Sequence, residues 1–259
     1  MLADMEIEQI PCLDSNYGWL IHDPASRRTA AVDTPDAAAI EGVLAAKGWV
    51  LTDIFNTHHH ADHTGGNLRL KQATGCTIYG PRGEAARIPG IDVALGEGDV
   101  VHLGASQALV LDVPGHTGGH IAYHFAGDGV AFVGDTLFSL GCGRLFEGTP
   151  AQMWHSLGKI MRMPGETMIY CAHEYTEANG RFALSVDPDN ADLLARMEEV
   201  AALRKQGAPT VPSRLDMERR ANPFLRSGEA GMARNLGMAG AEAGQVFAEL
   251  RRRKDCFSG

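Results

Sequence analysis

Histidines and an aspartate crowd the segment from residue 57 to residue 67, Thr-His-His-His-Ala-Asp-His-Thr-Gly-Gly-Asn. Imidazole nitrogens and carboxylate oxygens are the ligands that zinc and other borderline divalent metals prefer. In an extended chain His58 and His60 are two positions apart and point to the same side, and Asp62 and His63 follow at the next turn. We therefore expect this loop to offer two pairs of ligands to two neighbouring metal ions, which is typical of a dinuclear metal hydrolase.

Three further candidate ligands each follow a segment that reads as a strand, and side chains at such strand ends commonly gather into one site. A water shared between two cations loses its proton near neutral pH and becomes a nucleophile, so a bridging hydroxide is the expected reagent. The expected ligands form a first set, a second set and one bridging carboxylate: His58, His60 and His116; Asp62, His63 and His173; and Asp135. Of these, Asp62 and Asp135 are also the expected catalytic residues.

The other histidines are interpreted as supporting or packing residues. His59 lies on the opposite side of the extended loop from its neighbours, and His120 is expected to support a ligand rather than to bind metal itself. A histidine that stands alone after a strand is more often a capping or packing residue. This interpretation applies to His22, His102, His124 and His155.

Size and composition indicate an ordered globular protein. The chain has 259 residues, 44% of them hydrophobic, and no run of about 20 apolar residues that a membrane span would need. The first eleven residues lack a basic and then apolar pattern, so no signal peptide is expected. The five scattered cysteines favour a reducing compartment, and the net charge of -9 disfavours a broad nucleic-acid surface. We expect a cytoplasmic monomer that binds neither nucleic acid nor membrane.

Short strands separated by Gly, Pro and Asp turns predominate in the first two thirds of the chain. Helices are expected between them, at 35–47 with Thr34 as N-cap and Gly48 as terminator, and at 150–161 with Thr149 as N-cap. A short helix at 67–72 is expected to follow the histidine-rich loop. The expected strands are 5–10, 17–22, 29–32, 51–56, 77–79, 100–103, 108–113, 120–125, 130–133 and 167–171.

The pattern changes after Cys171. Residues 189–206 carry apolar side chains at helical spacing, residues 245–254 form another helical stretch, and no strand is expected beyond residue 175. The chain thus reads as an α/β sandwich followed by a helical domain. The expected division places residues 1–173 in a catalytic domain and 174–259 in a helical, substrate-binding domain.

The histidine-rich loop resembles the His-x-His-x-Asp-His hallmark of the metallo-β-lactamase superfamily. More narrowly, the chain resembles the glyoxalase II, or hydroxyacylglutathione hydrolase, family. The narrower resemblance spans nearly the whole chain and is carried by five segments: Gly134–Phe138, Gly141–Thr149, Cys171–Thr176, Asn222–Arg226 and Arg251–Asp255. It implies a four-layer αββα sandwich followed by a small C-terminal all-α domain. It also implies two divalent metal ions per chain, with zinc expected and iron or manganese as alternatives.

The resemblance further implies the reaction and its substrate contacts. The reaction is hydrolysis of the thioester S-D-lactoylglutathione to D-lactate and glutathione, the second step of methylglyoxal detoxification. The glutathione part is implied to lie against Arg144, Phe146, Tyr175, Arg251 and Lys254. Arg144 stands where lysine is common in the family, which keeps the charge but changes a point donor into a planar fork. Phe146 stands where some members have tyrosine, so one hydroxyl contact is missing.

Four other functions share some of these sequence features. A one-iron glutathione persulfide dioxygenase keeps the fold, but the long helical tail with Arg251 and Lys254 disfavours it. A β-lactamase is disfavoured by the absence of an export signal and by the extra helical domain. A non-catalytic binding protein is disfavoured, because its metal site would be closed and would have few ligands. A nucleic-acid hydrolase is disfavoured by the acidic balance of the chain.

Overall fold

The computed structural model describes residues 5–258. Their contacts divide the chain into two compact units. Unit 1 contains the chain up to Asp112 together with Thr117–Gly134. Unit 2 contains Val113–His116 and the chain from Asp135 onward. Within residues 5–258, none of the helices combines the length and the hydropathy that crossing a membrane requires.

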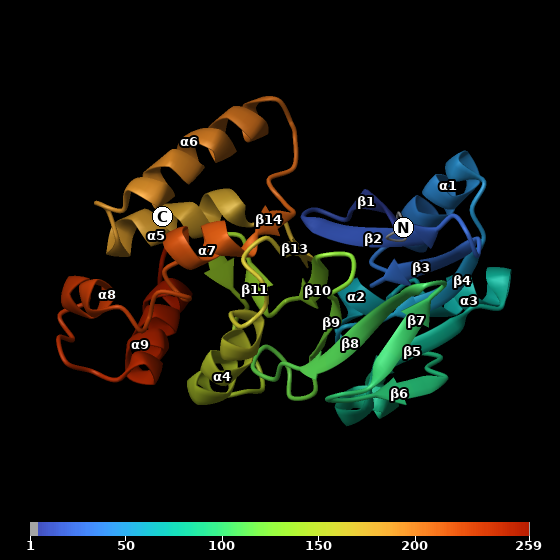
Figure 1. Cartoon of the computed structure of the whole chain (residues 1–259), viewed down its shortest axis with the longest axis horizontal. Helices are drawn as coiled ribbons and strands as arrows, with labels where there is room; N and C mark the ends of the chain where they lie inside the picture. The colour runs from blue at the N-terminus through green and yellow to red at the C-terminus, as the bar shows by residue number, and fades with distance from the viewer. Residues whose placement is uncertain (1–4, 259) are drawn as a thin grey trace. The chain divides into compact units, whose positions relative to one another are not determined.

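The first sheet of unit 1 has its strands side by side in the order in which they occur along the chain (Figure 1). The first three strands pair in antiparallel fashion, and from β3 onward the pairing is parallel. Parallel neighbours need a crossover connection, and helices supply it after β3 and β4. The strands are β1 (Glu6–Cys12), β2 (Asn16–Asp23), β3 (Arg28–Val32), β4 (Leu51–Phe55), β5 (Thr77–Pro81) and β6 (Val93–Leu95).

The helical segments of unit 1 are α1 (Ala37–Lys47), α2 (Ala61–Thr64), α3 (Asn67–Thr74) and the 3-10 helix η1 (Arg82–Arg87). Gly48 ends α1 in the left-handed conformation, which confirms the expected terminator. The expected N-cap was wrong. Asp36, not Thr34, caps α1 by accepting from the backbone N–H groups of Ala38 and Ala39. The hydroxyl of Thr34 instead donates to Asn67.

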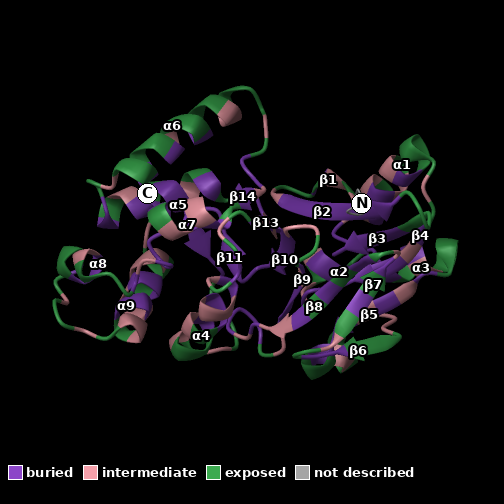
Figure 2. Cartoon of the chain, viewed as in Figure 1, coloured by how far each residue is buried: buried purple, intermediate pink, exposed green. Residues whose placement is uncertain are grey.

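The second sheet of unit 1 is an antiparallel meander of β7 (Val100–Leu103), β8 (Ser106–Asp112), β9 (Ile121–Phe125) and β10 (Val130–Gly134). Aromatic side chains join its inner face to the first sheet. The Phe55 and Tyr123 ring centroids lie 5.4 Å apart, and those of Trp19 and Phe132 lie 6.4 Å apart. The helix-covered side of the first sheet has its own core, made by residues such as Ile40, Leu44, Leu20, Ile54 and Ile78. Both sides of the central strands are therefore buried, as the purple β2 and β3 of Figure 2 show, whereas the edge strands β1 and β6 are partly exposed.

Helices predominate in unit 2, and its few strands are short. The expectation that no strand follows residue 175 was wrong, because Ser213–Arg214 pairs in antiparallel fashion with Met168–Ile169. A two-residue strand shows no alternation, so only its partner reveals it. The elements are β11 (Leu137–Phe138), β12 (Gly141–Cys142), α4 (Pro150–Ile160), β13 (Met168–Cys171), α5 (Thr176–Val186), α6 (Ala191–Lys205), β14 (Ser213–Arg214), α7 (Leu215–Ala221), α8 (Ala230–Asn235) and α9 (Ala243–Asp255).

The core of unit 2 packs between its helices. Leu140, Ala183, Leu193 and Ala221 form one buried cluster. Fully buried phenylalanines form a second contact series, in which Phe224 lies 5.9 Å from both Phe182 and Phe247, measured between ring centroids. Aromatic side chains in such contacts contribute large buried apolar areas.

A capping box formed by Thr149 and Gln152 begins α4. Thr149 accepts from the Gln152 backbone N–H at 3.2 Å, and the Gln152 side chain accepts from the Thr149 backbone N–H at 2.8 Å. We expect Thr149→Ala to lower the free energy of unfolding by about 1 kcal/mol, because this capping box is lost. Urea denaturation measures the change, and Thr149→Ser serves as the control that retains the cap. Equal stability of Thr149→Ala and the wild type would contradict the capping role.

Candidate metal centre and substrate pocket

The histidine-rich loop of unit 1 begins directly after β4 and is tied down at several backbone atoms. The backbone N–H of Thr57 donates to Asp33 at 2.8 Å, and its carbonyl accepts from the Ile121 N–H at 2.9 Å. The Asn56 side chain donates to the His63 carbonyl at 3.1 Å. These bonds hold both ends of the loop, so the ligand side chains project from a fixed backbone.

His58 and His60 project toward each other, as their spacing predicts. Nε2 of His58 and Nδ1 of His60 are 3.0 Å apart. The other ring nitrogen of His58 lies 3.0 Å from the Thr57 hydroxyl, and the ring stacks on His120 with centroids 4.6 Å apart. His58 is fully buried. Its orientation is therefore set by neighbours on two sides, and His120 has the supporting position expected of it.

His63 is oriented by a residue that the sequence analysis did not single out. The Asp33 carboxylate lies 2.8 Å from His63 Nδ1 and also accepts from the Thr57 hydroxyl at 2.8 Å. Because Nδ1 is engaged in this way, Nε2 faces the Asp62 carboxylate, 3.8 Å away. A carboxylate behind a histidine is the usual arrangement around metal ligands. The available signal was the position of Asp33 at the end of a buried strand, the same signal that identified Asp135.

His59 contacts a different carboxylate from the other histidines of the loop, although its ring lies 4.7 Å from that of His60, measured between centroids. Its backbone N–H and its Nδ1 both contact the buried Glu84 carboxylate, at 2.9 and 2.7 Å. The other oxygen of Glu84 accepts from the Gly119 N–H at 2.8 Å. Glu84 thus joins the histidine-rich loop to the segment after Thr117, and no local pattern in the sequence distinguishes it from other glutamates.

Unit 2 gathers the remaining candidate ligands around Asp135. One carboxylate oxygen of Asp135 lies 3.3 Å from His116 Nε2 and 3.4 Å from His173 Nε2, and all three residues are buried. Nδ1 of His116 lies 2.8 Å from the Arg144 carbonyl, which orients the ring. A side chain at Gly143 is excluded, because its Cβ would lie 1.9 Å from the Asp135 carbonyl oxygen.

Each unit by itself brings several of the expected ligands together, although neither unit contains a whole predicted set. Unit 1 has His58, His60, Asp62 and His63, and unit 2 has His116, Asp135 and His173. Nitrogen and oxygen donors of this kind suit a divalent transition metal. The contacts on Nδ1 of His63 and His116 leave Nε2 of each ring available for a metal, and a carboxylate that could bind the same ion lies close to each. The donor sets fit a metal site.

A pocket of about 210 Å³ in unit 2 contains most of the expected substrate residues: its lining is Phe138, Cys142, Arg144, Tyr175, Asn179, Arg251, Lys254 and Asp255. Phe146 is not among them; its ring is 61% exposed and lies 5.2 Å from the His116 ring. The Tyr175 ring stacks on His173 with centroids 4.6 Å apart. The pocket wall and one candidate metal ligand thus share an aromatic contact.

Cations dominate this pocket, with one acidic residue among them. Arg251 donates to Asp255 at 2.7 Å and to the Cys142 carbonyl at 2.9 Å, and Arg144 approaches the same Asp255 oxygen at 3.4 Å. Burial and, to a smaller extent, the nearby charges of Arg251 and Arg181 lower the pKa of Lys254 to about 8. The pocket can therefore bind an anion at neutral pH.

The cysteines of unit 2 that are buried near these groups have the wrong acidity for a nucleophile. Burial raises the pKa of Cys142 to about 11 and that of Cys171 to about 12. A thiol at such a pKa is protonated at neutral pH and is a poor nucleophile. Catalysis by either cysteine is thereby disfavoured.

Comparison with known proteins identifies the family. Residues 18–173 match the metallo-β-lactamase superfamily, and residues 174–257 match the hydroxyacylglutathione hydrolase C-terminus. The chain is 54% identical to the hydroxyacylglutathione hydrolase of Maricaulis maris over 99% of its own length and 100% of that protein. The chain belongs to the hydroxyacylglutathione hydrolase family.

Further comparisons agree with this membership. The hydroxyacylglutathione hydrolase of Methylococcus capsulatus is also 54% identical, over 98% of this chain and 100% of its own length. The crystal structure of ETHE1 from Myxococcus xanthus superposes with a TM-score of 0.69 at 25% identity, covering 96% of this chain and 90% of that one. The expected fold class is confirmed: a metallo-β-lactamase fold of mixed sheets flanked by helices, followed by the C-terminal helical domain of hydroxyacylglutathione hydrolases.

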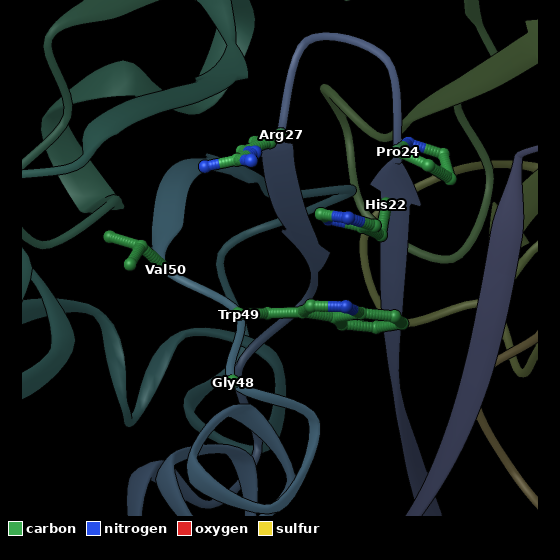
Figure 3. A pocket seen from close by; sticks show the side chains of 6 residues that line it. All are labelled: His22, Pro24, Arg27, Gly48, Trp49 and Val50. Atoms are coloured by element: carbon green, nitrogen blue, oxygen red, sulfur yellow. The ribbon is translucent and has the colours of Figure 1, made fainter.

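A second hollow, of about 360 Å³, lies in unit 1 of this hydroxyacylglutathione hydrolase family member (Figure 3). His22 stacks on Trp49 there with ring centroids 4.4 Å apart, and its Nδ1 lies 2.8 Å from the Thr29 hydroxyl. Its lining of His22, Pro24, Arg27, Gly48, Trp49 and Val50 includes no carboxylate or thiolate. The hollow therefore lacks the donors of a metal site, and His22 has the packing role expected of it.

The contact between Asp33 and His63 can be tested directly. We expect Asp33→Asn to weaken zinc binding by roughly 10- to 100-fold, because the amide is a poorer partner for the His63 Nδ1–H and does not raise the basicity of the ring. Titration of the metal-free protein against a chelator of known affinity measures the change. Asp23→Asn provides the control, since that buried aspartate accepts from Ala25 and Ser26 instead. Equal zinc affinity in Asp33→Asn and the wild type would remove Asp33 from the site.

Proposed function

We propose that this enzyme hydrolyses S-D-lactoylglutathione to D-lactate and glutathione and that it binds the glutathione part in the unit 2 pocket. The observation that carries the proposal is the identity of 54% to a named hydroxyacylglutathione hydrolase over almost the whole chain. The lining of the pocket supports it, because the three cations Arg144, Arg251 and Lys254 suit a tripeptide with two free carboxylates. For binding in the pocket, the positive charges of these three residues matter more than the acidic net charge of the chain, which acts at longer range.

We further propose that His58, His60, Asp62, His63, His116, Asp135 and His173 bind two divalent metal ions. Zinc fits imidazole and carboxylate donors, and iron and manganese remain the alternatives that metal analysis distinguishes. Such ions, when bound, supply Lewis acidity and lower the pKa of water toward neutrality. We also propose that the enzyme is monomeric and cytoplasmic.

Other roles in the reaction, such as orienting the ligands and the attacking water, belong to individual side chains and carbonyl groups. Asp33 and the Arg144 carbonyl hold His63 and His116 in fixed orientations. Asp62, whose carboxylate accepts from Asn16 at 3.0 Å, would orient the attacking water. Asp135, whose carboxylate lies 3.3 Å from His116 Nε2 and 3.4 Å from His173 Nε2, would supply a carboxylate ligand. A strong general acid is not required, because the thiolate of glutathione is a good leaving group.

The pocket residues would hold the leaving group in place. Arg251 is itself positioned by the Cys142 carbonyl and by Asp255, so its guanidinium enters the pocket in one orientation. Arg144 is more exposed and more adaptable. A rigid cation next to an adaptable one suits a flexible peptide, because only one of its carboxylates then needs a fixed partner.

The direct test is hydrolysis of S-D-lactoylglutathione by the purified protein, followed as loss of thioester absorbance with and without a chelator. We expect turnover that the chelator abolishes and that added zinc restores. Persistent turnover in the chelator, with metal analysis showing none bound, would refute a metal-dependent hydrolase. Consumption of oxygen with glutathione persulfide and no thioester hydrolysis would instead support the dioxygenase alternative.

Asp135 is the ligand whose loss has the broadest predicted effect. We expect Asp135→Ala to lower metal content and to lower kcat by about 100-fold or more, because one carboxylate serves both ions in the proposed site. Elemental analysis and kinetics on the same sample measure both effects, and Asp189→Ala on the exposed surface is the control. A variant that retains two metal ions and full activity would rule out the bridging role.

The acidity of Lys254 predicts a pH effect on binding. With a pKa of about 8 in the free enzyme, Lys254 is charged below that pH and loses its proton as the pH rises through it. We therefore expect KM for the anionic substrate to rise above about pH 8. The groups that set this pKa besides burial are Arg251, Arg181, Cys142 and Asp255.

Substitutions of Lys254 separate this titration from that of the substrate's own amino group. Lys254→Arg stays charged and should have a flatter KM profile across pH 7 to 10. Lys254→Gln should have a raised KM below about pH 8, where the wild-type lysine is charged, and a flat profile that the wild type approaches at higher pH. If all three proteins share one profile, Lys254 does not contact the substrate.

A further inference from the structure

The short hairpin formed by β11 and β12 makes one wall of the unit 2 pocket. Leu137 pairs with Cys142 and Phe138 pairs with Gly141, so Ser139 and Leu140 form a two-residue turn. Phe138 and Cys142 line the pocket. Leu140 lies in the left-handed region with φ of 57°, which is an unfavourable conformation for a leucine. Something outside the hairpin must stabilise this conformation.

Helix α7 and the residue that follows it supply part of that support (Figure 1). The Asn222 side chain donates to the carbonyls of Phe138 at 3.1 Å and Gly141 at 3.0 Å. The Glu218 carboxylate accepts from the Leu140 N–H at 2.9 Å, and from the Asn222 side chain at 3.1 Å. The segment Asn222–Arg226 supplies no candidate metal ligand and no residue of the pocket lining. Its first residue, Asn222, instead donates to the hairpin that forms the pocket wall.

Side chains hold a backbone group at every position of the hairpin from Phe138 to Cys142. Asn179 donates to the Ser139 carbonyl at 3.2 Å, and Arg251 donates to the Cys142 carbonyl at 2.9 Å. These two bonds, with those of Asn222 and Glu218, account for all five residues. The polar contacts of the hairpin therefore come from α5, α7 and α9 as well as from its own two strands.

Burial makes these bonds important. Glu218 and Asn222 are fully buried, as is Leu140. A buried backbone group that loses its partner is costly, typically by about 1–3 kcal/mol. Burial also raises the pKa of Glu218, while the hydrogen bonds that it accepts from the Leu140 N–H and from Asn222 act in the opposite direction. The hairpin cannot move without breaking bonds that water does not replace.

The hairpin in turn contacts the groups that face the substrate. The Phe138 ring lies 5.5 Å from the Tyr175 ring and 5.9 Å from the His173 ring. The Cys142 carbonyl holds Arg251, whose guanidinium also lies over the Phe224 ring at 5.3 Å. A shift of the hairpin would therefore displace an aromatic wall and a cation of the pocket together.

We propose that Glu218 and Asn222 are positioning residues for the glutathione part of the substrate, acting through the Phe138–Cys142 hairpin on Tyr175 and Arg251. The inference rests on the proposed function, because it assumes that glutathione occupies this pocket. A purely structural role for Glu218 and Asn222 predicts loss of stability with no specific effect on binding. The positioning role predicts weaker binding in a protein that is folded and retains its metal.

The experiment compares two substitutions of each residue. Glu218→Leu keeps the volume but removes the acceptor, whereas Glu218→Gln retains an acceptor oxygen. Asn222→Asp removes both donors, whereas Asn222→Ser retains one. Arg220→Gln is the matched control on α7, because that side chain is exposed and pairs with Asp192. The measurements are KM and kcat for S-D-lactoylglutathione, Kd for the non-hydrolysable thioether S-methylglutathione, metal content and thermal midpoint.

We expect Glu218→Leu and Asn222→Asp to raise KM and Kd by roughly tenfold or more, with metal content unchanged and kcat within about twofold of wild type. Glu218→Gln should remain close to wild type, and Asn222→Ser should be intermediate. If Glu218→Leu or Asn222→Asp does not fold, the comparison of Asn222→Ser with wild type decides the matter.

Two results would overturn the inference in distinguishable ways. Unchanged Kd in folded Asn222→Ser, Asn222→Asp and Glu218→Leu, whatever their thermal midpoints, would leave these residues a structural role alone. Failure of the wild type itself to bind S-methylglutathione and to hydrolyse the thioester would refute the proposed function first, and the inference with it.

Discussion

The carboxylate of Asp33 is the constraint on which the histidine-rich loop depends. It accepts from the backbone and the hydroxyl of Thr57 and lies against Nδ1 of His63, each at 2.8 Å. Asp33 makes these contacts from a left-handed backbone conformation with φ of 57°, which aspartate tolerates better than most residues. Because β3 and β4 are parallel, their ends lie at the same edge of the sheet. One short side chain can therefore fix both the start of the loop and a candidate ligand six residues further along.

In unit 2, too, buried side chains form hydrogen bonds with the backbone of another segment, and there several side chains take part. There, the side chains of Glu218, Asn222, Asn179 and Arg251 satisfy backbone groups along a hairpin that has only two residue pairs of its own. Each hydrogen bond contributes about 1 kcal/mol net, but an unsatisfied partner in a dry environment costs more than the bond contributes. A buried network of such bonds consequently resists displacement more strongly than its summed energy suggests. In both candidate sites, long-range side-chain bonds to the backbone supplement the little regular secondary structure present.

Local charge, and not net charge, determines what the unit 2 pocket can bind. The chain carries a formal charge of -9, yet Arg144, Arg251 and Lys254 line one hollow of about 210 Å³. Solvent and salt screen the distant carboxylates, whereas partly buried cations near one another interact through a medium that screens them less. The lowered pKa of Lys254 reflects burial first and cationic neighbours second. An incoming carboxylate would offset the repulsion between these cations, so the pocket suits an anion although the chain as a whole is acidic.

Much of the candidate metal site could be predicted because its chemistry is local in sequence. His58, His60, Asp62 and His63 lie within six positions, and extended chain geometry alone brings the first two to one side. The helix after Asn190 and the buried strands could be predicted equally well, since their periodicity depends only on neighbouring residues. What only the tertiary structure decided is which distant side chains support these elements. Glu84 meets His59 across 25 positions, and Glu218 meets Leu140 across 78. Such pairs leave no periodic pattern, because a hydrogen bond between remote segments depends on how the chain packs and not on the residues next to either partner.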